Sequence, residues 1–105
     1  MGLEIFWSQF AKLKLEEIYQ YYRIKANKRT AQKIANGIVS QTIDLDKNPQ
    51  IGQVEEDLKD KIREFRYLVY TDYKIIYYIN KKAKRIIIAN VFDTRQNPEK
   101  IKETL

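Results

Sequence analysis

The spacing of apolar residues in this chain changes from helical to strand-like near its middle. Apolar side chains recur every three or four positions from Gln9 to about Lys25, and again from about Arg29 to Asp46, as in helices that bury one face. After residues 49–60 apolar and polar side chains alternate instead, which is typical of strands. Since 105 residues suit one folding unit, we predict a single α+β domain over residues 1–105.

The first half of the chain contains signals for where its elements begin and end. Leu3 to Trp7 has the composition of a short strand, and Trp7 is expected to pack under the first helix. Ser8 can cap that helix, because its hydroxyl accepts from a free amide of the first turn. Asn48-Pro49 ends the second helix, since the residue before a proline is disfavoured in helical conformation. The two helices are expected to form an antiparallel hairpin.

The second half is expected to form an antiparallel sheet of consecutive strands. Residues 49–60 are expected to be a polar connector without regular structure. The predicted strands and final helix are Arg63–Tyr70, Tyr73–Ile79, Arg85–Phe92 and, capped by Asn97, Glu99–Leu105. The first strand would pair with one strand of this three-stranded meander, and the helical hairpin would cover one face of the sheet. Tyrosines and basic side chains would then line the other face or a groove beside the C-terminal helix.

The composition excludes several kinds of chemistry. The chain has no cysteine and no histidine, so disulfides, thiolate nucleophiles, Cys-ligated metals and Ser-His-Asp sites are absent from it. Carboxylates alone remain as strong metal ligands, and we expect neither a metal nor a cofactor. No segment approaches the ~20 apolar residues of a membrane span, and the N-terminus lacks the features of a signal peptide. We therefore expect a cytoplasmic protein that does not bind a membrane.

The net charge of +6 lies entirely in residues 59–105, which hold 12 basic and 6 acidic residues. Such an imbalance favours a polyanionic partner, although a solvated lysine-rich surface is the simpler alternative. Five cations in this half are weak candidates for nucleic-acid contacts. They are Arg63, Lys81, Lys82, Lys84 and Arg85.

Three segments together resemble the RelE/ParE superfamily of bacterial toxins. They are Pro49-x-x-Gly52, the run REFRYLVYTDYKIIYYI over 63–79, and the run IIIANVFDTRQNPEKI over 86–101. The resemblance covers essentially the whole chain and implies the superfamily's fold, which is similar to that of microbial ribonucleases. It also implies the toxin component of a type II toxin–antitoxin module, of the kind that stabilises plasmids.

The resemblance leaves the mechanism open. RelE-like members cut messenger RNA on the ribosome without a metal, whereas ParE-like members lack the nuclease residues and inhibit DNA gyrase. In both groups a cognate antitoxin neutralises the toxin in a hetero-oligomer. A third possibility is an inactive toxin fold that is retained as an antitoxin-binding regulator.

The resemblance also assigns candidate catalytic residues. Arg95 matches the phosphate-binding arginine of RelE-like nucleases, and Lys74 occupies the place of another arginine. Glu64 and Arg66 would share one strand face, where a carboxylate base beside a cation is chemically sensible. Against these roles, Glu64 and Arg66 can simply form an exposed ion pair, and Arg95 can pin the C-terminal segment through Asp93. Ile101 stands where a nuclease would have a tyrosine.

Overall fold

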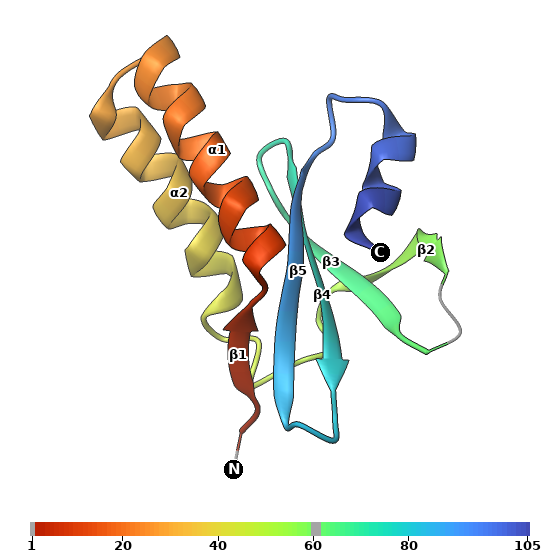
Figure 1. Ribbon diagram of the computed structural model, residues 1–105. Coiled ribbons are helices and arrows are strands. Elements are labelled where there is room, and N and C mark those ends of the chain that lie inside the picture. Colours follow the sequence, from red (N-terminus) through yellow and green to blue (C-terminus); the bar gives the residue numbers. More distant parts are fainter. Residues whose placement is uncertain (1, 60–61) are drawn as a thin grey trace.

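The computed structural model describes residues 2–59 and 62–105. Its elements follow the order β-α-α-β-β-β-β with a C-terminal 3₁₀ helix (Figure 1). The bounds are β1 Glu4–Trp7, α1 Gln9–Lys25, α2 Lys28–Thr42, β2 Gln53–Lys59, β3 Glu64–Tyr70, β4 Tyr73–Asn80, β5 Arg85–Asp93 and η1 Pro98–Thr104. The predicted α+β fold, with its N-terminal strand, helical hairpin, meander and short last helix, is confirmed.

The sheet has the strand order β1-β5-β4-β3-β2 in the described part of the chain. β1 pairs in parallel with β5, and the remaining neighbours are antiparallel. The expectation that 49–60 lacks regular structure is wrong, because β2 extends the meander by one strand; residue 60 itself lies outside the described residues. β2 shows no apolar alternation because Glu55 and Leu58 are its only buried residues and its register shifts between Val54 and Lys59.

Both helices begin at side-chain caps. The Ser8 hydroxyl accepts from the Ala11 amide at 3.1 Å and donates to the Ala89 carbonyl at 3.2 Å. Ser8 thus caps α1 as predicted and also ties it to β5. Asn27 caps α2 in the same way by accepting from Thr30 at 2.8 Å. The predicted second helix is too long, because residues 43–47 form turns.

Helices lie on both faces of the sheet, the α1–α2 hairpin on one and η1 on the other (Figure 1), and each face has its own core. The larger core lies under the helical hairpin and is formed by Ala11, Ile38, Leu45, Tyr73, Ile75, Tyr77, Ile86, Ile88 and Val91. The smaller core lies on the other face, where η1 packs, and is formed by Leu58, Phe65, Ile76, Ala89, Phe92 and Ile101. Trp7 packs against the first core, as expected. Side chains of successive strand residues therefore reach two different layers.

Candidate functional site

Arg95 follows β5 and is held by the last residue of that strand. Its Nε and Nη2 donate to the two carboxylate oxygens of Asp93, each at 3.0 Å. The backbone amide of Arg95 donates to the same Asp93 Oδ1 at 2.9 Å. A guanidinium that is paired in this forked way keeps one orientation. Half of the Arg95 side chain is nevertheless exposed, so it remains available to a partner.

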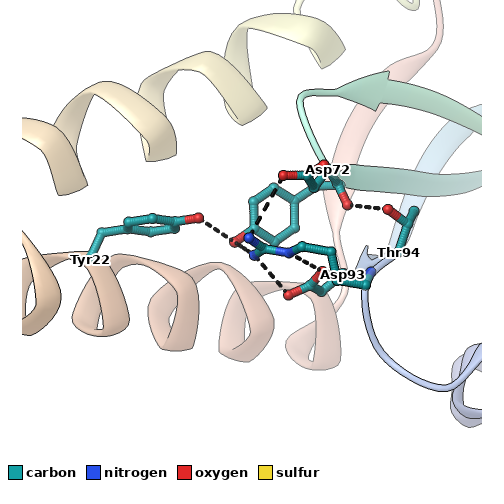
Figure 2. Close-up of polar contacts among 6 residues, drawn as sticks. Tyr22, Asp72, Asp93 and Thr94 are labelled. Atoms are coloured by element: carbon teal, nitrogen blue, oxygen red, sulfur yellow. Dashed lines mark hydrogen bonds and ion pairs between the residues drawn. The ribbon is translucent and has the colours of Figure 1, made fainter.

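Two tyrosines connect Arg95 to the first helix (Figure 2). Arg95 Nη2 lies 3.4 Å from the Tyr73 hydroxyl, which donates to the hydroxyl of Tyr22 in α1 at 3.3 Å. Asp72 adds an ion pair to Arg95 at 3.7 Å, and its carbonyl accepts from both the amide and the hydroxyl of Thr94. The network therefore joins α1, the β3–β4 turn and the end of β5.

Three groups in this network, Asp93, Arg95 and Tyr73, have pKa values shifted away from neutrality. The hydrogen bond from Arg95 lowers the pKa of Asp93, and the same bond raises the pKa of Arg95. Burial, with the bond to Tyr22, raises the pKa of Tyr73. Efficient proton transfer needs a group whose pKa is near the working pH. Asp93 and Arg95 stay charged and Tyr73 stays protonated, so this network is suited to binding rather than to proton transfer.

A hollow of about 440 Å³ lies between this network and α1. It is lined by Lys14, Glu17, Ile18, Tyr21, Tyr73, Val91, Asp93, Arg95 and Gln96. Along the same helix Leu13, Tyr21 and Ile24 are each more than half exposed. Their spacing of eight and three residues places them on one side of a 3.6-residue helix. We call these three residues the α1 stripe.

Lys74 points to the opposite face of the sheet, as its alternation with Tyr73 and Ile75 predicts. Its ammonium lies 2.7 Å from a carboxylate oxygen of Glu55 in β2 and 4.3 Å from the centre of the Tyr67 ring. The Glu55 side chain is only 4% exposed. The carboxylate therefore depends on Lys74 for a counter-charge. Lys74 thus has a structural role as the ion-pair partner of Glu55.

We expect Lys74→Met to lower the free energy of unfolding by about 3 kcal/mol, because it leaves the buried Glu55 carboxylate without its cation. Urea denaturation measures this change. The double variant Glu55→Gln/Lys74→Met should regain most of the loss, since it removes both charges and Gln can still accept from the Asp57 amide that now bonds to Glu55. A loss below 1 kcal/mol in the single variant would show that water already screens the pair.

Arg66 and Glu64 do share a strand face and form an ion pair of 2.9 Å. Arg66 also donates to the carbonyls of Gly52 at 2.8 Å and Gln50 at 3.3 Å, and only 17% of its side chain is exposed. These bonds hold the segment before β2 against β3. Arg66 therefore has a structural role in the fold, whatever else it does.

The structure places the four candidate catalytic residues in three separate locations. Arg66 lies opposite Tyr77 on β4, whereas Arg95 contacts Tyr73. Tyr73 and Tyr77 are four residues, or about 13 Å, apart along the strand. Lys74 lies on the other face. Ile101, in the place of the expected tyrosine, is buried in the smaller core.

The weaker nucleic-acid candidates gather at the opposite end of the sheet from Arg95. Lys81, Lys82 and Lys84 are exposed in the β4–β5 turn. Arg85 begins β5 and lies 3.7 Å from Glu4 in β1. Arg63 precedes β3, and its guanidinium lies 5.0 Å from the centre of the Tyr78 ring.

The sequence predicted the nearby acidic partners of the candidate cations but not the distant ones. The sequence places Tyr22 on the apolar face of α1 and Tyr73 in a strand. Their contact was not predicted, because 51 positions separate them. Glu55 lies in the segment that was expected to be a loop. Asp93 and Glu64 could be identified from spacing, because each lies two residues from its arginine.

The described residues contain no group of three or more carboxylates that could hold a metal ion. Neither helix in the same part of the chain is long and apolar enough to cross a membrane.

Comparisons with known proteins agree with the resemblance seen in the sequence. A family model described as the ParE toxin of the type II toxin–antitoxin system parDE matches residues 5–98. A search of curated proteins gave no match. A solved structure of the chromosomal ParDE system from P. aeruginosa superposes with a TM-score of 0.71 at 18% identity, covering 88% of this chain and 96% of that one. That similarity establishes a shared fold. With the family match over most of its length, the chain belongs to the ParE toxins of type II toxin–antitoxin systems.

Proposed function

We propose that this toxin arrests growth in the cytoplasm by binding a protein, DNA gyrase, and that it does not cut messenger RNA. Membership of the ParE family supports the toxin role. The observation that carries the mechanism is the separation of Arg95, Lys74 and Arg66, each of which is bound to its own carboxylate.

Cleavage of RNA makes demands that this arrangement does not meet. A base must take the 2′-hydroxyl proton, cations must stabilise the transition state, and an acid must protonate the leaving oxygen, all around one phosphate. Lys74 is on the far side of the sheet from Arg95. Arg95 contacts Tyr73, whereas Arg66 lies opposite Tyr77, about 13 Å further along β4. The shifted pKa values around Arg95 move away from neutrality. These features favour the binding of a protein target over the cleavage of RNA.

The face that includes Arg95 has the composition of a protein-binding surface. Arginine and tyrosine are enriched among the residues that dominate binding energy at interfaces. Here Arg95 and Tyr21 line one hollow, and the exposed Leu13 and Ile24 extend it along α1. We assign the target-binding face to Arg95 and the α1 stripe.

Gyrase inhibition by the purified chain tests this proposal. We expect the toxin to block supercoiling of a relaxed plasmid by gyrase, and the Glu55→Gln/Lys74→Met variant to block it equally well. In cells the same variant should remain toxic, because it removes a nuclease candidate without touching the target-binding face. Loss of toxicity in a variant whose unfolding curve matches the wild type would support the ribonuclease instead. Absence of growth arrest by the wild type would indicate an inactive fold that only binds antitoxin.

We further propose that the cognate antitoxin docks in an apolar groove beside β1. The groove measures about 550 Å³ and is lined by Ile5, Phe6, Trp7, Lys12, Leu15, Glu16, Tyr19, Ala35 and Val39. In the described part of the chain β1 is an edge strand paired with β5, so an extended segment could add to the sheet there while its apolar side chains fill the groove. Acidic residues in that segment would complement the basic half of the chain.

The double variant Phe6→Ser/Tyr19→Ser should escape its antitoxin while it stays toxic. Both side chains line the groove, and neither belongs to the hydrophobic cores. Losing contacts with large apolar side chains weakens binding by about 1.5–3 kcal/mol each, or more than tenfold. Titration calorimetry with the purified antitoxin measures this loss. Ile43→Ser/Ile51→Ser, at exposed positions outside the groove, should bind antitoxin normally; an equal loss there would exclude the groove.

A further inference from the structure

We propose that the β4–β5 turn, together with Arg63, binds the phosphate backbone of duplex DNA. We call this surface the basic turn and define it by Arg63, Lys81, Lys82, Lys84 and Arg85. It is separate from the target-binding face and does not depend on which protein the toxin inhibits.

The basic turn concentrates positive charge, most of which has no acidic partner among the described residues. Four cations occur between residues 81 and 85, and residues 78–92 contain no acidic residue. Within the described ranges, no carboxylate is within ion-pair distance of Arg63 or of the three lysines, while Arg85 has only the mostly exposed Glu4 at 3.7 Å. By contrast, Arg66, Lys74 and Arg95 each have a carboxylate within 3.0 Å.

The turn holds these cations in a defined arrangement. The side-chain oxygen of Asn80 accepts from the Ala83 amide at 3.1 Å, and the Lys84 amide donates to the Lys81 carbonyl at 3.2 Å. Lys84 adopts a φ of 55°, a left-handed conformation that costs an ordinary residue roughly 1–2 kcal/mol and that glycine or asparagine would tolerate better. A lysine at this strained position is therefore consistent with a use for its charge.

Arg63 extends the surface from a second segment of the chain. A hollow of about 460 Å³ is lined by Ile62, Arg63, Tyr78, Ile79, Asn80, Lys81 and Lys82. The Arg63 guanidinium lies over the Tyr78 ring at 5.0 Å from its centre, which orients it beside Lys81 and Lys82. Cations from two segments thus line one hollow, and lysine and arginine are common donors to phosphate oxygens.

The neighbours of these cations favour a duplex over other polyanions. Single strands are bound largely by stacking bases on aromatic rings, but Arg63 covers the Tyr78 ring and Phe65 packs edge-on against it at 5.4 Å. RNA duplexes are recognised partly through their 2′-hydroxyls, and the one amide of the turn, Asn80, is used within the turn. Lysines and arginines alone suit the closely spaced phosphates of DNA.

Fluorescence anisotropy with the purified full chain and a labelled 20-base-pair DNA duplex tests the proposal. We compare Lys81→Gln/Lys82→Gln/Lys84→Gln with the matched control Lys28→Gln/Arg29→Gln/Lys33→Gln, which removes the same charge from exposed positions of α2. The turn variant should bind at least about tenfold more weakly at 50 mM salt, and its slope of log K against log salt should be about 2 to 3 units shallower than that of the wild type. The control should bind within about threefold of the wild type.

Each other outcome overturns the proposal. Equal losses in the two variants would mean that net charge alone attracts DNA, and a larger loss in the α2 variant would place the surface on the helix. Tighter binding to single-stranded RNA of the same length, or binding only to vesicles that contain phosphatidylserine, would assign a different ligand to the turn. No measurable binding of the wild type at 50 mM salt would exclude a DNA-binding surface.

Discussion

Replacing Arg95 by alanine is expected to abolish growth inhibition while the protein remains folded. An arginine at the centre of an interface typically contributes 2 kcal/mol or more, so target affinity should fall by roughly thirtyfold or more. Stability should change by less than about 1 kcal/mol, because the ion pairs that Arg95 makes with Asp93 and Asp72 are partly exposed. Inhibition of gyrase supercoiling, titrated with toxin, measures the loss.

Two further variants test whether the effect of Arg95→Ala is specific to this position and to the guanidinium group. Arg23→Ala removes an exposed arginine from the last turn of α1 and should leave toxicity unchanged. Arg95→Lys retains the charge but not the forked pairing, and we expect it to recover only part of the activity. Antitoxin binding, measured by calorimetry, should be normal in all three variants because the groove beside β1 is intact. Full toxicity of Arg95→Ala would remove Arg95 from the target-binding face.

Replacing Tyr77 by phenylalanine is expected to lower the free energy of unfolding by about 2–3 kcal/mol. The ring is fully buried, and its hydroxyl donates to the Pro49 carbonyl at 2.7 Å while it accepts from the Gly52 amide at 2.9 Å. Phenylalanine would keep the packing but leave these backbone groups without a partner, which is costly for buried groups. Thermal unfolding should show a midpoint lower by about 10 °C or more.

Tyr78→Phe is the matched control for this change. Tyr78 is the next residue on the same strand, is half-buried and lies on the other face of the sheet, and its hydroxyl makes no hydrogen bond within the described residues. We expect its loss to change stability by less than about 0.5 kcal/mol. Similar midpoints for the two variants would mean that the segment before β2 is not held by Tyr77.

Much of the fold could be predicted because its elements repeat one pattern over many residues. The helical spacing of α1 corresponds to the face that packs against the larger core. β4 was predicted from its apolar and aromatic run, and its side chains enter both cores. The prediction failed where a pattern was absent or misleading. Edge strand β2 buries only Glu55 and Leu58, and Leu45 continues the apolar stripe of α2 after the helix itself has ended.

The candidate site was harder to predict because its partners are distant in sequence. Arg95 could be singled out from its motif and paired with the nearby Asp93. Its contacts to Tyr73 and Tyr22 depend on how α1 crosses the sheet, which no local spacing reveals. In the same way, the counter-charge of Lys74 comes from β2, a strand that the sequence did not indicate.

We propose that this ParE-family toxin acts by binding a protein rather than by cutting RNA. Mapping the 5′ ends of messenger RNA shortly after the chain is expressed alone tests it most directly. We predict growth arrest without new translation-dependent ends. New ends clustered at one phase of the codon, and absent when Arg95→Ala is expressed instead, would contradict the claim and establish a ribosome-bound ribonuclease.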